Sequence, residues 1–211
     1  MTAAEQTPEQ QGRINKAKKN IAYFFYFAII MFFAGLSSAY LVSMGGANYW
    51  VRFRLPAPFW WSTAFIVVSS ATVQMALIQA RKNNKRAVVP WVLATLVLGA
   101  CFTASQFKGW NELLHDGYAL VSRFKSLQGE YGTDYTIERR GIPLVKSGEQ
   151  YFLPEDAGFA HPLNAEMEES LNTASSYFHV ITYAHFAHVI GGLIALVVMS
   201  IKAGLGRYGA Q

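Results

Sequence analysis

The chain has 211 residues, of which 52% are hydrophobic, 15% aromatic and 15% charged, and its formal net charge is +5. Soluble domains carry about 25% charged residues, so this chain is short of charge. Its hydrophobicity excludes intrinsic disorder for most of its length. The single cysteine, Cys101, excludes a disulfide within the chain and a multi-cysteine metal site. A compact soluble domain and a small polytopic membrane protein remain.

The distribution of apolar residues favours the membrane protein. About 20 consecutive apolar residues cross a bilayer, and four segments meet that length: residues 21–44, 59–80, 87–107 and 174–202. None of them contains Asp or Glu, and Lys202 is the only basic residue in them. We therefore predict an all-α, polytopic membrane helix bundle with four transmembrane helices. Its parts are an N-terminal segment (1–20), the first three helices (21–108), a long outer loop (109–173), the fourth helix (174–202) and a tail (203–211).

Lysine and arginine gather on one side of this arrangement. Ten basic residues face two acids there, Glu5 and Glu9. Cytoplasmic loops of membrane proteins carry such an excess, so we expect both termini to be cytoplasmic, in a bacterial inner (cell) membrane. The positive charge then sets topology, and we expect no nucleic-acid partner. The ten residues are Arg13, Lys16, Lys18, Lys19, Arg81, Lys82, Lys85, Arg86, Lys202 and Arg207.

The connection before the fourth span is acidic and long. Residues 108–173 hold six basic and eleven acidic residues, and loops of this length are seldom idle. Apolar spacing predicts an amphipathic helix over 110–125. Strands at 135–137 and 151–153 are predicted to form a small β-hairpin, and 165–172 a short acidic helix. The loop either contacts a neighbouring subunit or an electron carrier, or only covers the helix ends; we favour subunit contact over a carrier.

Three histidines lie within the fourth span: His179, His185 and His188. A haem held by two histidines needs a second helix that supplies one, and no other span does. A di-iron site needs carboxylates in the spans, and a zinc site needs three or four ligands. We therefore expect these histidines to pack and form hydrogen bonds between helices. No catalytic, cofactor-binding or metal-binding residue is predicted, and residue chemistry alone indicates a structural or accessory membrane subunit.

Short motifs in all four spans resemble subunit III of the haem–copper oxidases. The fourth span follows that family's pattern T-G-x-H-G-x-H-V-x-x-G, and the first resembles its MFFAGL-x-SAY run. Leu55-Pro-x-Pro58 before the second span also fits, as does a Q-x-x-x-W exit from the third. The residues that carry this resemblance and are expected to pack helices are Met31, Gly35, Gln106, Trp110, Thr182, His185, His188 and Gly192.

The resemblance implies an accessory subunit of a respiratory terminal oxidase, which reduces oxygen and translocates protons. Such a subunit is not catalytic alone: haem and copper reside in partner subunits. It binds subunit I laterally, holds phospholipids and supports assembly and sustained turnover. Cytochrome c and quinol both remain open as electron donor, and an anchor or scaffold subunit of another, quinol-oxidising complex is the alternative.

Four features depart from the family pattern. Ile29 stands where the family commonly has a glutamate linked to proton uptake, which puts a proton-uptake role in doubt. Tyr183 and Phe186 replace two glycines of the fourth helix. The outer loop is longer than usual, and the family's last helix is not present, so we expect a short bacterial form in which a neighbouring subunit supplies that helix or none does.

Overall fold

The computed structural model describes residues 8–82, 84–156, 158–168 and 170–204, so Glu5 and Arg207 lie outside the described residues. Four of its helices are long and apolar enough to cross a membrane, which confirms the predicted polytopic helical fold. They are α1 (Pro8–Gly46), α2 (Ala57–Arg81), α3 (Lys85–His115) and α5 (Thr173–Gly204). Each begins before its apolar run and ends after it. Length and composition thus make the chain a multi-pass membrane protein.

Helix α1 belongs to the first of two units into which the chain divides, residues 1–46. Apolar side chains are exposed all around it: Phe24 is 73% exposed and Val42 72%. A helix that is apolar on every side needs a lipid or protein environment. The described part of this unit holds only the helix itself, so these side chains need cover from outside the unit.

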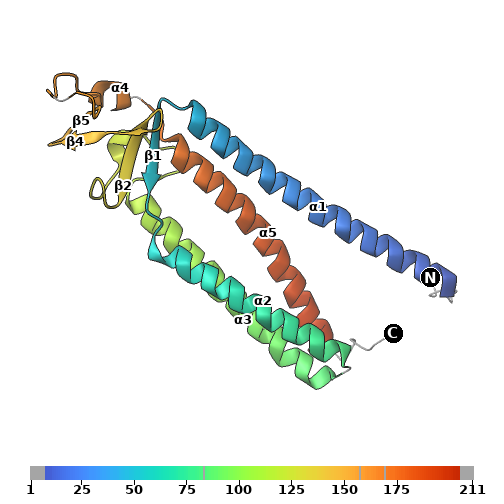
Figure 1. Ribbon diagram of the computed structural model, residues 1–211. Helices are drawn as coiled ribbons and strands as arrows, with labels where there is room; N and C mark the ends of the chain where they lie inside the picture. Colours follow the sequence, from blue (N-terminus) through green and yellow to red (C-terminus); the bar gives the residue numbers. More distant parts are fainter. Residues whose placement is uncertain (1–7, 83, 157, 169, 205–211) are drawn as a thin grey trace. The chain divides into compact units, whose positions relative to one another are not determined.

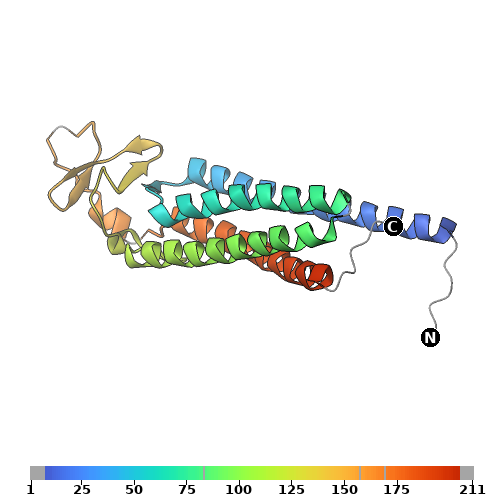
Figure 2. The same cartoon turned by 90° about the horizontal axis from the view of Figure 1, so that it is seen from below.

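The second unit, residues 47–211, contains the other three long helices. Helices α2 and α3 lie side by side along their length in both views (Figures 1 and 2), and α3 also contacts α5. Thr72 and Thr95 share a hydrogen bond of 2.8 Å between their hydroxyl oxygens across the α2–α3 contact. At Gly99 of α3, a Cβ atom would lie 2.6 Å from Cδ2 of Leu193 on α5. The absence of a side chain there lets α3 and α5 approach closely.

Strands form in the short connection before α2 and in the long connection between α3 and α5. Strand β1 (Tyr49–Phe53), from the short connection, pairs antiparallel with β2 (Tyr135–Arg139), from the long one, and β2 pairs with β3 (Ile142–Pro143). Val51 and Ile137 are partners in that register and are almost completely buried. We call residues 47–56 and 116–172 the strand region.

The predicted hairpin is wrong in its pairing. Both predicted segments are strands, but β2 turns back onto β3, and β4 (Val145–Ser147) pairs with β5 (Gln150–Phe152). Arg140 and Gly141 both have positive φ, 49° and 84°, as the tight two-residue turn between β2 and β3 requires. Each predicted strand therefore pairs with a neighbour across a short local turn, β2 with β3 and β5 with β4. The two predicted strands do not pair with each other across a wider hairpin.

Helix α3 ends earlier than the predicted helix over 110–125. It stops at His115, and only a short 3₁₀ helix, η1 (Phe124–Ser126), follows. Gly117 has a φ of 87°, the Tyr118 N–H donates to the Leu113 carbonyl at 2.8 Å, and the Gly117 N–H to that of Leu114 at 3.3 Å. These paired bonds form a Schellman motif, which ends a helix where a glycine takes the left-handed conformation.

The acidic helix is shorter than predicted, since α4 spans Asn164–Glu168. Asn172 cannot continue it, because its side-chain oxygen accepts a hydrogen bond from the Ser175 N–H at 3.3 Å and caps α5. Glu166 of α4 accepts hydrogen bonds from the Tyr49 hydroxyl at 2.7 Å and from Arg139 at 3.2 Å. These bonds tie α4 to the first two strands.

Candidate functional site

Two motif residues meet where α3 faces α5. The indole N–H of Trp110 donates to the Thr182 hydroxyl at 3.3 Å, and Trp110 is almost fully buried. Its ring also packs edge-on against Tyr183 and Phe186, with centroids 4.8 and 5.2 Å away. Both aromatic residues stand where the resembled family has glycine, so this chain fills with rings the space that glycine would leave open. Gln106, one turn before Trp110, is also buried.

His179 lies on the same contact and is completely buried. Its Nδ1 lies 2.9 Å from the Ser175 carbonyl oxygen, and because a carbonyl only accepts, Nδ1 carries the proton. Nε2 is buried and has no hydrogen-bond partner within the described part of the chain. The ring thus bonds to the backbone of its own helix and packs against the Tyr183 ring, whose centroid is 5.4 Å away, which is a packing role.

His185 and His188 lie farther along α5 and are exposed on this chain. Nδ1 of His188 is 2.8 Å from the Ala184 carbonyl, and the His185 ring packs edge-on to Phe102 of α3 at 6.1 Å. Gly192 is exposed, and a Cβ atom there would meet nothing within 4 Å. Across the described ranges, no group of three or more His, Cys, Asp or Glu is placed to hold a metal.

The two motif residues of the first span, Met31 and Gly35, lie on α1 and are exposed there. They are four residues apart, so they share one face of the helix. A Cβ atom at Gly35 would meet nothing within 4 Å. They belong to the first unit, so they are described apart from the α3–α5 contact.

An apolar cleft of about 320 Å³ opens between α2, α3 and α5. Its walls are almost entirely aliphatic, with Thr95 supplying the one hydroxyl. Such a lining suits hydrocarbon rather than a polar ligand. Representative lining residues are Val73 and Leu77 of α2, Val88 and Val92 of α3, and Leu196 and Met199 of α5.

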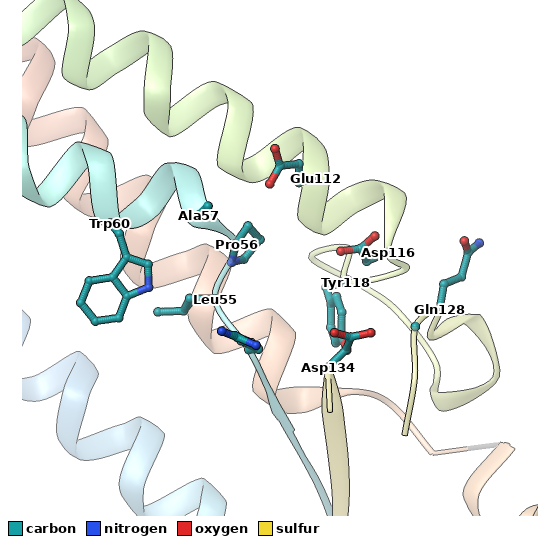
Figure 3. A pocket seen from close by; sticks show the side chains of 11 residues that line it. Leu55, Pro56, Ala57, Trp60, Glu112, Asp116, Tyr118, Gln128 and Asp134 are labelled. Atoms are coloured by element: carbon teal, nitrogen blue, oxygen red, sulfur yellow. The ribbon is translucent and has the colours of Figure 1, made fainter. Parts of the chain in front are cut away.

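A second, polar pocket of about 460 Å³ lies where α2 begins and α3 ends. Trp60 and Leu55 lie on one side of it, and Asp116, Tyr118 and Asp134 on the other (Figure 3). Its remaining lining residues include Arg54 and Glu112. Sequence reasoning missed this pocket because its members come from four separate segments, which only the β1–β2 pairing brings together.

Four tyrosines of the strand region are protected from ionisation. Burial raises the pKa of Tyr118, Tyr131 and Tyr151 above the ordinary value of 10.0. Burial and then the hydrogen bond to Glu166 raise the pKa of Tyr49. The Tyr135 and Tyr151 hydroxyl oxygens are 3.1 Å apart, so one donates to the other. The hydroxyl groups of Tyr49, Tyr131, Tyr135 and Tyr151 form hydrogen bonds that hold the strand region together.

The chain is similar to curated oxidase subunits. It is 27% identical over 186 residues to the probable cytochrome c oxidase subunit 3 of Nocardia farcinica, a match that covers 85% of this chain and 66% of the relative. It is 25% identical over 201 residues to the cytochrome c oxidase subunit 3 of Bacillus sp. strain PS3, covering 90% of this chain and 89% of the relative.

A shorter match links it to quinol oxidases. It is 34% identical over 80 residues to the quinol oxidase subunit 3 of Bacillus subtilis, covering 36% of this chain and 39% of the relative. The matched part of the chain thus spans just under two thirds of the Nocardia relative and well under half of the Bacillus subtilis relative. No protein-family model and no solved structure matches the chain. The relatives, one matched over 90% of this chain, make it a homologue, at modest identity, of the subunit 3 proteins of cytochrome c and quinol oxidases.

Proposed function

We propose that the chain is the accessory subunit III of a haem–copper terminal oxidase that takes electrons from cytochrome c or quinol. The observation that carries this proposal is the match to oxidase subunit 3 proteins, one of which covers 90% of the chain. The register of the motif residues on α5 agrees with it. In this role the chain supports assembly and sustained turnover, and haem and copper belong to its partner subunits.

The exposed motif face of α5 is where a partner subunit would bind. His185, His188 and Gly192 are exposed on the isolated chain, and the open space at Gly192 allows another helix to approach closely. Polar side chains within a span face protein rather than lipid. Subunit I of the oxidase is the proposed occupant of this face, and the exposed face of Met31 and Gly35 on α1 offers a second contact.

The accessory role is supported by the lack of acidic residues in the described apolar segments of the spans. Their described apolar segments contain no Asp or Glu, and position 29 is an isoleucine. Proton relays and ion-coupled carriers place carboxylates at depth. The chain therefore has no carboxylate with which to take up protons inside the membrane, and proton translocation falls to its partners.

Phospholipids are proposed as further partners. The apolar cleft between α2, α3 and α5 suits an acyl chain by its aliphatic lining. The acidic strand region is proposed to lie outside a bacterial cell membrane, with both chain termini in the cytoplasm, and to contact a neighbouring subunit. The excess of Lys and Arg at the opposite helix ends supports this orientation.

Purification from its native membrane in mild detergent tests the proposal. We expect a many-helix partner with haem and copper to co-purify with the full chain. A colourless preparation that contains no partner would overturn the proposal. A partner that oxidises quinol and holds haem without copper would instead favour an anchor subunit of another respiratory complex.

His185→Leu sharpens the test. We expect it to reduce the yield or the working lifetime of the complex more than its initial rate of oxygen reduction. His115→Gln is the matched control, since the His115 side chain is 85% exposed at the end of α3, outside the motif face. Loss of all initial turnover in a fully assembled His185→Leu complex would contradict the accessory role.

A further inference from the structure

The polar pocket at the ends of α2 and α3 separates charges of opposite sign instead of pairing them. Arg54 lines it together with Glu112, Asp116 and Asp134. No carboxylate of the described residues lies within ion-pair distance of the Arg54 guanidinium, although three line the same cavity. The pocket therefore presents one unpaired cation and several anions to whatever enters it.

The backbone fixes this arrangement. The Arg54 N–H donates to the Asp134 carbonyl at 2.8 Å, directly after the last β1–β2 pair. Asp134 also accepts the Glu130 N–H at 2.9 Å through its side chain, which leaves its second carboxylate oxygen for a ligand. At Gly129, whose φ is 112°, a Cβ atom would come within 3.0 Å of the Asp134 carboxylate. A bare backbone there keeps room beside that acid.

An unpartnered group points to a ligand independently of the acids. Tyr118 lines the pocket and is only 3% exposed, and its hydroxyl has no hydrogen-bond partner among the described residues. A buried hydroxyl left without a partner costs about 1–3 kcal/mol. In Figure 3 its ring lies between Asp116 and Asp134. The wall of the pocket therefore contains, beside the acids, a polar group that the chain itself does not satisfy.

The position of the pocket selects the source of the ligand. It lies at the first turn of α2 and the last turn of α3, where two candidate membrane spans end. Trp60 is 71% exposed on its rim beside Leu55, as aromatic residues are at the level of lipid headgroups. A lipid bound there can extend its acyl chains along the exposed apolar side chains of α2, whereas a soluble ligand would leave that rim bare.

We propose that this pocket binds the headgroup of a zwitterionic phospholipid with a primary amine, a phosphatidylethanolamine. Arg54 binds the phosphate, for which its planar guanidinium offers paired donors. Glu112, Asp116 and Asp134 accept the N–H donors of the ammonium group. The inference rests on the membrane placement within the proposed function but not on the identity of any oxidase partner.

Two other common headgroups fit less well. A phosphatidylglycerol carries a net negative charge and would meet three carboxylates without an ammonium group to balance them. A phosphatidylcholine has a trimethylated amine, which donates no hydrogen bond to carboxylates. The apolar cleft between α2, α3 and α5 is a different site, since its lining offers no charge to any headgroup.

Lipid retention by the purified full chain tests the proposal. The chain is stripped in detergent, offered one lipid at a time, and analysed by native mass spectrometry. We expect phosphatidylethanolamine to be retained over phosphatidylcholine and phosphatidylglycerol. Arg54→Gln should reduce its retention about tenfold, the loss of one charge-assisted interaction. Equal retention of the three lipids, or an unchanged Arg54→Gln variant, would overturn the proposal.

Two further variants distinguish a specific loss of lipid binding from misfolding of the chain. Arg52→Gln is the matched control, because Arg52 lies two residues away and pairs with Glu138 instead of lining the pocket; its retention should match the wild type. Glu112→Gln combined with Asp116→Asn should shift preference toward phosphatidylglycerol, which a misfolded chain would not do. Equal preference in that double variant and the wild type counts against the proposal.

A competition experiment distinguishes an intact lipid from a soluble molecule with the same headgroup. Soluble phosphoethanolamine should displace the bound lipid only at far higher concentration than an intact lipid does. Displacement at equal concentration would assign the pocket to a soluble ligand and overturn the lipid assignment. Haem content is recorded on the same preparations, so a failed oxidase assignment and a failed lipid site give separate readouts.

Discussion

Gly117→Ala tests the physical reason why α3 ends where it does. Gly117 has a φ of 87°, and a Cβ atom there would lie 1.9 Å from the backbone oxygen of Ser126. The left-handed conformation costs about 1–2 kcal/mol in an L-residue. The clash adds to this cost, because a backbone oxygen cannot rotate away as a side chain can.

The structure shows what relief of the clash would break. Moving residues 126–128 away separates the Gln128 N–H from the Asp116 carbonyl, 2.9 Å apart, and the Ser126 hydroxyl from the Gly117 carbonyl, 3.3 Å apart. Each hydrogen bond contributes about 0.5–1.5 kcal/mol. Together with the backbone strain, the variant should lose about 2–5 kcal/mol of local stability.

Hydrogen exchange of the full chain in detergent measures this loss. A loss of that size lowers the protection of the Tyr118 and Gln128 amides roughly 30- to 4,000-fold. Gly132→Ala is the matched control, since Gly132 has a φ of 90° but open space around its Cβ position. The control should show the backbone strain alone, roughly 5- to 30-fold. Equal losses in the two variants would refute the steric part of the reasoning.

Two further predictions concern the strand region and the helix contact. Burial favours the neutral form of Tyr118, Tyr131 and Tyr151 and raises their folded-state pKa above 10.0, so their contribution to stability is complete below pH 10.0 and is lost as pH rises through the folded pKa. Tyrosinate absorbance should therefore show these groups ionising only as the strand region unfolds; ionisation near pH 10.0 in the folded chain would contradict the burial. Trp110→Phe and Thr182→Val, singly and together, should give a coupling energy of about 0.5–1.5 kcal/mol in unfolding measurements; a coupling near zero would show that the hydrogen bond between them does not stabilise the helix contact.

The helical part of the fold was predictable because the bilayer imposes one strong length requirement. Uncharged runs long enough to span it can be read directly, and all four became helices. The end of α3 was not predictable. The helical spacing of apolar residues continues past Gly117, but the backbone leaves the helical conformation there. Strand pairing was not predictable either: the apolar–charged alternation of residues 51–55 marks an extended segment in the short connection but does not identify its partner, which is far along the chain.

The candidate site divides in the same way. The motif positions on α5 were visible in the sequence, and their placement on one long helix follows from its period. The contact between Trp110 and Thr182 depends on how two helices pack, which no spacing within either helix specifies. The polar pocket depends on Arg54 and Asp134 meeting across the strand pair, so a reading of single segments could not find it.

The β1–β2 pair has a consequence for how the chain is made. Val51 leaves the ribosome before α2 and α3, and Ile137 only after both. Until then β1 waits as an unpaired strand edge with its apolar side chains uncovered, a template on which other chains can add. The β1–β2 pair can therefore form only after α2 and α3 have been synthesised, and we expect it to form only when their insertion has brought both strands to the same side of the membrane.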